Sequence, residues 1–150
     1  MYTLVLKLQG IELGGLDRLT DTAPLARAVF PRVHEALVAI VEDVFAAEGD
    51  PPWQALTDMT LWDRVSHGFA EGPILVRTGE LLRSFTDSGH PFHVDERRYS
   101  FRESTMTFGS ADPRAVPLGE GLPEDNLPAR PMFPPADVIA YELSESSMLR

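Results

Sequence analysis

The most constraining feature of this sequence is a concentration of proline near its C-terminal end. Seven of the 13 prolines lie within residues 113–135, and the same stretch carries apolar side chains such as Leu127 and Phe133. Each proline fixes one backbone angle and removes a hydrogen-bond donor, so a regular helix and a central strand are both excluded there. The apolar side chains argue against a solvated linker. We therefore predict an ordered, extended arm over 113–135 that lies outside the domain interior.

Length and composition indicate a single globular domain. The chain has 150 residues, of which 43% are hydrophobic and 24% are charged, and it contains no cysteine. The lack of cysteine excludes disulfides, thiolate catalysis and Cys-ligated zinc. No apolar run approaches the roughly 20 residues that span a bilayer, so no membrane partner is expected.

The charge balance argues against one class of function. The formal net charge is −10, from 23 acidic and 13 basic residues, and Lys7 is the only lysine. Proteins that bind nucleic acid through its phosphates do so with clustered cations. An acidic chain of this kind is not expected to bind DNA or RNA over its whole surface.

One long amphipathic helix is predicted over residues 23–48, with Thr22 as its N-cap and Gly49 just beyond its end. Pro31 lies inside it and predicts either a kink or the start of a second helix. The apolar side chains that recur every three or four residues are expected to form the core contact with a sheet: Leu25, Val29, Val33, Leu37, Val41 and Val44.

The remaining elements are short. They complete an α+β fold in which the long N-terminal amphipathic helix packs on a small, mainly antiparallel sheet. We expect a strand at 2–9, helices at 60–69 and 79–85, and strands at 90–94, 98–102 and 105–108. Residues 136–147 could form a helix or a strand, and a helix is the preferred interpretation. The expected organisation is a single domain made of a core (1–112), the proline-rich arm (113–135) and a C-terminal segment (136–150).

The sequence contains no recognisable catalytic, cofactor-binding or metal-binding constellation, so we do not expect an enzyme. His90 and His93, followed by Asp95 and Glu96, could supply metal ligands. However, Pro91 prevents a helix from turning both imidazoles the same way, and residues three apart on a strand point to opposite faces. A surface hairpin is the preferred interpretation. His34 is expected at the rim of the long helix rather than as a catalytic base.

The two tryptophans, Trp53 and Trp62, could stack on nucleic-acid bases, but the acidic charge makes buried anchors the preferred interpretation for both.

Three motifs, in this order, resemble the phage virion morphogenesis or tail-completion family of Mu-like and related tailed phages. The first runs from Phe45, in the last turns of the predicted helix, to Leu56. The second is an Ile-Leu…Thr-Gly-x-Leu segment, and the third is a glycine-rich turn before a Pro-Ala-Arg-Pro block. Together they cover about 45–133. The residues that carry the resemblance are Trp53-x-x-Leu56, then Ile74-Leu75 with Thr78-Gly79-x-Leu81, then Gly109, Gly119-x-Gly121 and Leu127-Pro128-Ala129-Arg130-Pro131-Met132-Phe133.

The resemblance implies a structural virion protein that forms a ring, expected to be a hexamer, at the neck or the top of the tail. Such a protein completes the tail and joins it to the head. The implied partners are other copies of the chain and the neighbouring neck, connector and tail-tube proteins, while DNA passes through the lumen without specific binding. The implied location is the virion, after assembly in the host cytoplasm. The motif residues expected at interfaces are Trp53, Leu56, Gly79, Leu81, Gly109, Gly121, Pro128, Ala129, Arg130, Pro131 and Phe133.

Arg130 is the residue of the arm best suited to a polar contact. The flanking Pro128 and Pro131 favour an extended backbone, and a guanidinium can bind a carboxylate through two hydrogen bonds. We expect that carboxylate to come from a neighbouring subunit or ring. The alternative is that Arg130 pairs within its own subunit and only ties the arm down.

Two other functions stay open at this point. One is a monomeric adaptor or binding module that uses the proline-rich arm as a clamp. The other is a small hydrolase whose site the sequence does not reveal.

Overall fold

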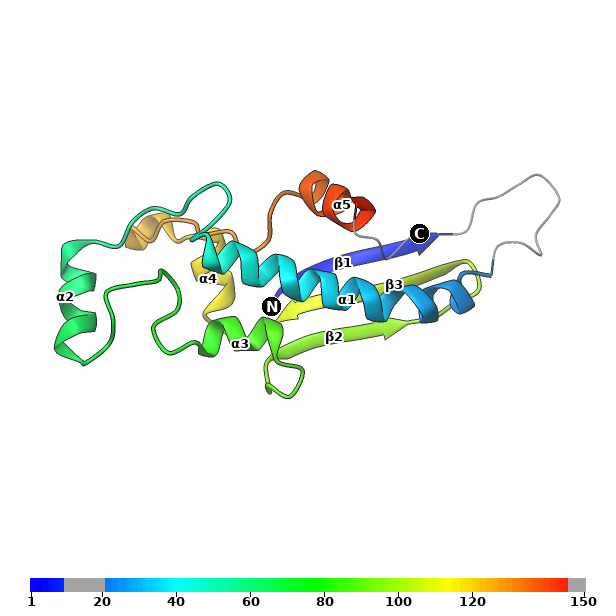
Figure 1. Cartoon of the computed structure of the whole chain (residues 1–150), viewed down its shortest axis with the longest axis horizontal. Coiled ribbons are helices and arrows are strands. Elements are labelled where there is room, and N and C mark those ends of the chain that lie inside the picture. The colour runs from blue at the N-terminus through cyan, green and yellow to red at the C-terminus, as the bar shows by residue number, and fades with distance from the viewer. Residues whose placement is uncertain (10–20, 146–150) are drawn as a thin grey trace.

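A computed structural model, which describes residues 1–9 and 21–145, has an α+β fold. Figure 1 shows an elongated molecule in which α1 crosses a small sheet and α2 lies at one end. The elements in chain order are β1 Tyr2–Gln9, α1 Thr22–Ala46, α2 Asp58–Ser66, α3 Glu80–Thr86, β2 His93–Arg98, β3 Glu103–Ser110, α4 Ala115–Glu120, the 3-10 turn η2 Pro123–Asp125 and α5 Ala136–Glu145. The long helix is therefore the second element, after the predicted N-terminal strand.

The sheet is antiparallel throughout, with β3 between β1 and β2. Leu4 pairs with Phe108 and Leu6 with Met106 across β1 and β3. Since side chains alternate along a strand, these pairs share one face of the sheet. Met106 and Phe108 are completely buried within the cluster that contains the α1 core residues, so this face carries the main core.

The long helix is confirmed, but its ends differ from the prediction. Asp21 is the N-cap and accepts a hydrogen bond from the Ala23 amide. Thr22 is already helical, and its hydroxyl donates to the Ser100 carbonyl. The helix ends at Ala46 and continues through Pro31 without a second start. Pro31 is exposed, so water can reach the carbonyl that its missing N–H leaves unpaired.

The predicted apolar stripe of α1 is correct in its C-terminal half and wrong at Leu25. Leu37 and Val41 are fully buried, whereas Leu25 is 55% exposed. Ala26 and Phe30 occupy the buried positions instead. The core side of the helix follows steps of four and seven residues through Ala26, Phe30, Leu37 and Val41, and Leu25 lies about 100° away from that line.

The hairpin contains two strands where three were predicted. The segment expected as a strand at 98–102 is mostly the turn between β2 and β3, and β3 is longer than expected. A hairpin is present, but it begins only at His93, and the side chain of His90, which precedes it, is 7% exposed and not at the surface as predicted. The helices close to 60–69, 79–85 and 136–147 are confirmed; residues 146 and 147 of the last one lie outside the described residues.

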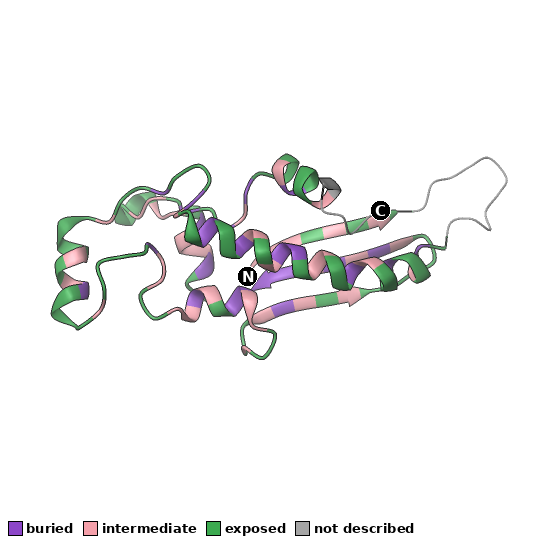
Figure 2. Ribbon diagram, in the orientation of Figure 1, coloured by how far each residue is buried: buried purple, intermediate pink, exposed green. Residues whose placement is uncertain are grey.

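The two tryptophans have opposite environments. Trp53 is 7% exposed and contacts the Phe45 ring edge-on, with 5.4 Å between the ring centroids. Trp62 is 67% exposed, so its predicted burial is wrong. It belongs to α2, which lies away from the sheet and is largely exposed in Figure 2.

The proline-rich stretch is ordered, but it is neither extended throughout nor fully outside the interior. Helix α4 occupies part of it, so the exclusion of helix over 113–135 is wrong there. Pro117 is the third residue of this six-residue helix, and the N–H groups of the first turn have no partner within a helix in any case. Met132 is fully buried in the main hydrophobic cluster, so this end of the arm belongs to the core.

None of the helices in the part of the chain that the structure describes is long and apolar enough to cross a membrane.

The core assignment of α1 predicts a sharp contrast between two substitutions. Val41→Asp places an unpaired charge in the core and is expected to cost several kcal/mol, on the order of 3–5. Leu25→Asp, at an exposed site of the same helix, is expected to change the free energy of unfolding by less than about 0.5 kcal/mol. Urea unfolding followed by circular dichroism measures both. Equal losses in the two variants would contradict the helix orientation.

Candidate functional site

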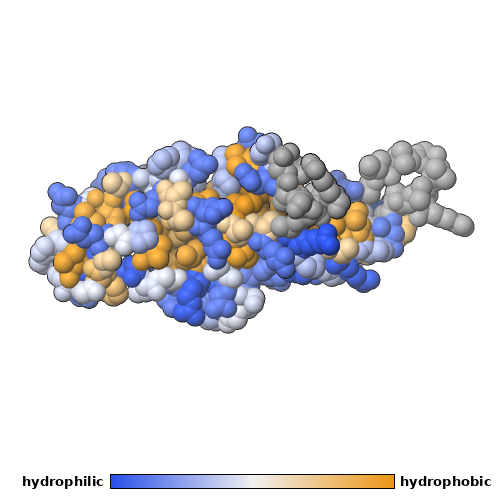
Figure 3. Space-filling model, in the orientation of Figure 1, coloured by the Kyte–Doolittle hydropathy of each residue, from blue (hydrophilic) through white to orange (hydrophobic). Residues whose placement is uncertain are grey.

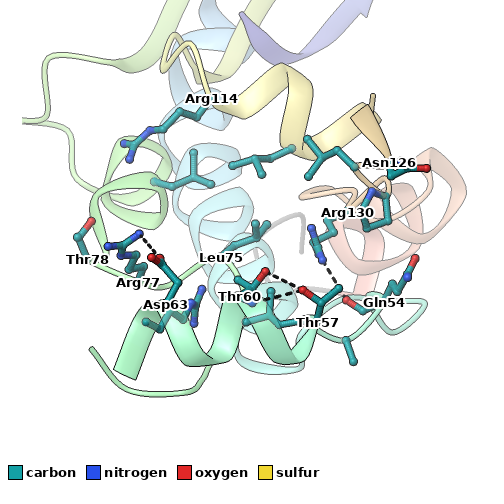
Figure 4. Close-up of a pocket in the computed structure, with 17 residues that line it drawn as sticks. Gln54, Thr57, Thr60, Asp63, Leu75, Arg77, Thr78, Arg114, Asn126 and Arg130 are labelled. Atoms are coloured by element: carbon teal, nitrogen blue, oxygen red, sulfur yellow. Dashed lines mark hydrogen bonds and ion pairs between the residues drawn. The ribbon is translucent and has the colours of Figure 1, made fainter. Parts of the chain in front are cut away.

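A pocket of about 530 Å³ brings several of the family-motif residues together. It lies where α2, the segment leading into α3, and the α4-to-arm segment meet (Figure 4). Leu56, Leu81, Pro128 and Arg130 line it, although they come from three separate motifs of the sequence. The walls between the charged groups are formed by leucines, including Leu75, Leu118 and Leu127.

The other motif residues of the arm fix its shape behind the pocket. The Trp53 indole N–H donates to the Pro131 carbonyl at 3.0 Å, and Phe133 stacks on Tyr2 with 5.4 Å between the ring centroids. Gly121 has a φ of +77°, and a Cβ there would lie 2.7 Å from the Ala129 nitrogen. Only glycine therefore lets the end of α4 approach the arm this closely.

Among the remaining motif glycines, Gly79 and Gly109 serve the fold at other places. Gly79 has a φ of +77° and caps the N-terminus of α3. Gly109 lies in β3, where a Cβ would be 2.2 Å from the Tyr2 carbonyl oxygen of β1. Neither glycine lines the pocket. The motif thus divides into pocket-lining residues and residues that shape the backbone around them.

Four of the 12 arginines line this pocket, together with a single acidic side chain, Asp63. In Figure 4, Arg77 and Arg114 lie on the side opposite to Arg130. Arg77 pairs with Asp63 at 3.5 Å and lies over the Phe69 ring. An otherwise acidic chain therefore concentrates cations at one concave site.

Arg114 has a partner just outside the pocket. Its guanidinium makes two hydrogen bonds to the Asp112 carboxylate, at 2.9 and 2.6 Å, and its backbone N–H donates to the same carboxylate. These bonds hold the pKa of the buried Asp112 carboxyl below its usual range. The charge of Asp112 is thus compensated within the chain.

Arg130 lacks such a partner. It is 5% exposed, and the only acceptor that its guanidinium finds among the described residues is the Gln54 carbonyl, 3.2 Å from Nη2. Its Nε is buried without a hydrogen bond. Burial, followed by the nearby charge of Arg64, lowers the pKa of this guanidinium. Arg130 therefore does tie the arm to its own subunit, which is one of the two alternatives. The acceptor is a backbone carbonyl, however, and the predicted carboxylate is not supplied by the described residues.

Arg64 is the second buried arginine of the pocket, at 5% exposure. Its Nη1 donates to the carbonyls of Glu71 and Pro73, at 3.3 and 3.0 Å, and no carboxylate among the described residues pairs with it. Two buried guanidiniums thus share one pocket with only neutral acceptors. An uncompensated buried charge costs several kcal/mol, so the pocket has the charge and the free donors that suit an anion.

Arg130 is marked in the sequence by its flanking prolines, but nothing in the sequence connects it with Arg64, Arg77 or Arg114. No residue pattern of α2 distinguishes Arg64 from a solvated arginine, because its burial arises from the loop at 71–73 folding back over it. The four side chains come from segments up to 66 residues apart, from Arg64 to Arg130. Only the tertiary structure places them together.

The histidines form contacts that the sequence analysis did not identify. His34, half-buried on α1, lies with its Nε2 3.1 Å from the His93 Nε2 and 3.8 Å from Asp95, and burial lowers the pKa of its imidazole. His90 instead lies 3.2 Å from Glu80 of α3. His90 and His93 therefore point to different partners, and no group of three potential metal ligands occurs within residues 1–9 and 21–145.

The close approach at Gly121 predicts a measurable difference between two glycines. Gly121→Ala combines an unfavourable φ with the clash against the arm, whereas Gly68→Ala has almost the same φ, +78°, and no atom within 4 Å. We expect Gly68→Ala to cost about 1 kcal/mol and Gly121→Ala clearly more, because only the latter displaces the arm. Thermal unfolding of both variants measures this, and equal losses would mean that the arm moves aside freely.

The Asp112–Arg114 pair predicts a pH dependence of stability. Because the pKa of Asp112 is lower in the folded than in the unfolded chain, its contribution is fully present above about pH 5. It is lost as the pH falls through the usual aspartate value of about 3.9 and on to the folded pKa. Asp112→Asn should cost about 1–3 kcal/mol at pH 7, and its difference from the wild type should shrink toward pH 3. Urea unfolding across this range tests it; a difference independent of pH would contradict the assignment.

Comparison with known proteins places this site in context. The model of the phage virion morphogenesis family matches residues 6–143, a span that includes every residue lining the pocket. A similar protein is the "Putative capsid assembly protein G" of Escherichia phage Mu, which is 34% identical over 122 residues, covering 77% of this chain and 72% of that protein. No solved structure matches the chain.

Proposed function

The chain belongs to the phage virion morphogenesis family, and from that premise we propose that it forms a ring at the neck or the top of a phage tail. In this role it is a structural protein of the particle that completes the tail and joins it to the head. The ring is made by contacts between unlike surfaces of neighbouring copies, as closed rings require, and six copies are expected.

The observation that carries this proposal, beside the family itself, is an apolar surface on α2. Met59, Trp62 and Val65 are 73%, 67% and 52% exposed and follow one another at steps of three residues, so they lie on one side of the helix. Apolar residues reach the surface at this end of the molecule in Figure 3. Exposed apolar side chains that gather on one element are typical of protein–protein contacts.

The position of α2 supports such a contact. The helix lies at one end of the elongated molecule (Figure 1), and Arg64 is its only buried residue. A helix that contributes so little to the hydrophobic core of its chain gains stability when a neighbouring molecule covers its apolar side. Its carboxyl-terminal turn and the arginine pocket are adjacent, so a single neighbouring molecule can contact both.

The net charge of −10 fits passage of DNA through such a ring. Cationic walls would hold the phosphates by counterion release, whereas carboxylates repel them and keep the DNA mobile. DNA is therefore proposed as a transient occupant of the lumen and not as a bound ligand. A ring whose inner wall is lined with arginines would contradict this part of the proposal.

A monomeric adaptor that uses the arm as a clamp is the second candidate. The observation that favours it is the arginine pocket, which can bind a segment of an unrelated protein. Light scattering coupled to size-exclusion chromatography separates the two candidates, because it distinguishes a ring from a monomer. Electron microscopy of particle necks tests the location, and the rotational symmetry of the class averages gives the number of copies. A neck that lacks density for this chain would refute the proposal.

The ring proposal predicts unlike effects of the same substitution at the two tryptophans. Trp62→Ser should leave the melting temperature within about 1–2 °C of the wild type, because the side chain is exposed, and should strongly reduce ring formation. Trp53→Ser should lower the melting temperature by about 6–12 °C, as expected for about 3 kcal/mol lost from a buried aromatic in a chain of this length. Calorimetry and light scattering measure the two effects. Unchanged ring formation by Trp62→Ser would remove α2 from the interface.

A further inference from the structure

We infer that the pocket between Arg64 and Arg130 is a carboxylate-binding site, filled in the assembled particle by an acidic side chain of a second copy of this chain. This inference rests on the proposed ring for the source of the carboxylate, and on the geometry of a single chain for the site itself.

The first argument is the unmet hydrogen-bonding capacity of Arg130. A guanidinium has five N–H donors in a planar fork, and here the Gln54 carbonyl satisfies one of them. Nε is buried without a partner, while the side chain as a whole is 5% exposed and borders the pocket. A carboxylate at this fork would accept the hydrogen bonds that the chain leaves unmade.

The second argument is the unpaired charge of Arg64. The other two arginines of the pocket have carboxylates within the chain, Asp63 for Arg77 and Asp112 for Arg114. Arg64 and Arg130 are the buried cations of the described residues, and both have only carbonyl acceptors. The missing negative charge therefore belongs in the pocket that both residues line, where Arg64 is near enough to lower the pKa of Arg130.

The third argument concerns the kind of anion. Between the charged groups the pocket is lined by leucines and by polar side chains such as Thr57 and Thr60, which suits the methylene stem of an acidic side chain and the polypeptide on either side of it. A nucleic-acid backbone carries a charge at every phosphate, and the remaining surface of this acidic chain repels it. A carboxylate on a protein segment is thus favoured over a phosphate.

The fourth argument identifies the source. The chain has 23 acidic side chains, and several exposed ones make no ion pair in the described part of the molecule, including Glu42 and Asp43 on α1 and Asp137 on α5. In a ring of unlike contacts, a cationic pocket on one copy meets a different, acidic surface on the next. One chain therefore carries both the cationic pocket and the acidic surface that such a contact between copies requires.

The test measures ring assembly of the full chain by light scattering, with three substitutions. Arg130→Gln, which keeps a donor for the Gln54 carbonyl, should raise the protein concentration needed for assembly by about tenfold or more. Arg130→Lys should be intermediate, since it keeps the charge and loses the fork. Arg98→Gln, at an exposed arginine of β2, is the matched control and should have no effect. Equal assembly of all three variants and the wild type overturns the inference and leaves the ring intact.

A competition experiment on the wild-type chain avoids the risk that a variant folds poorly. Glutarate, a small dicarboxylate, should shift the Arg130 Nε–H signal in nuclear magnetic resonance spectra and oppose assembly. Neutral glutaramide, and sodium chloride at equal ionic strength, are the controls and should do less. Inorganic phosphate acting at lower concentration than glutarate would overturn the choice of carboxylate.

The two proposals fail in different ways. Binding of glutarate to a chain that stays monomeric at every concentration refutes the ring and the second copy as the source, while the carboxylate site stands. Assembly that is unaffected by glutarate and by Arg130→Gln refutes the site and leaves the ring. Glutarate binding combined with unaffected assembly shows that the carboxylate comes from a different protein.

Discussion

The attachment of residues 131–133 to the core is the interaction on which the pocket depends. The Trp53 indole donates to the Pro131 carbonyl, the Met132 amide donates to the Tyr2 hydroxyl, and the Phe133 ring stacks on Tyr2. These contacts link the loop after α1, the first strand and the arm. Since Pro128 and Arg130 precede this attachment directly, it helps to fix Pro128 at the pocket and the Arg130 guanidinium at the Gln54 carbonyl.

The same attachment explains why proline suits this segment. A chain that must run along the surface from α4 to Tyr2 gains little from helix or strand hydrogen bonds, and prolines reduce the entropy that it loses on becoming ordered. The segment still forms hydrogen bonds where they are available. Leu122 and Leu127 form an isolated antiparallel bridge, and the Arg130 amide donates to the Leu118 carbonyl. The arm is thus stiff by composition and fixed at defined points.

The sequence was sufficient to predict the elements that depend on periodicity and insufficient for those that depend on tertiary contacts. The strand at 2–9 and the long helix follow from local patterns, because their residues alternate or recur with the period of the element itself. The burial of Trp53 and the exposure of Trp62 do not follow from local patterns, since Trp53 lies in a proline-rich loop and Trp62 on a helix with apolar neighbours at Leu61 and Val65. What separates them is the distance of α2 from the sheet, which the connecting loops decide.

The candidate site was predictable only in part for the same reason. Arg130 stood out because prolines flank it, whereas Arg64 is buried by a loop that returns over α2. In an acidic chain most cationic side chains are exposed to solvent and lie near a carboxylate. Arg83 of α3 is an example, since it pairs with Glu80 of the same helix and with Asp87 just after it. Two buried arginines without carboxylates depart from that arrangement, and the departure occurs in the same pocket where the family motifs converge. The proposed contact between copies would account for both facts, because a charge left unpaired in one molecule can be compensated by the next. Burial makes the Arg130 charge costly in the single chain, and the same low-dielectric surroundings would strengthen its bond to a carboxylate of a second copy.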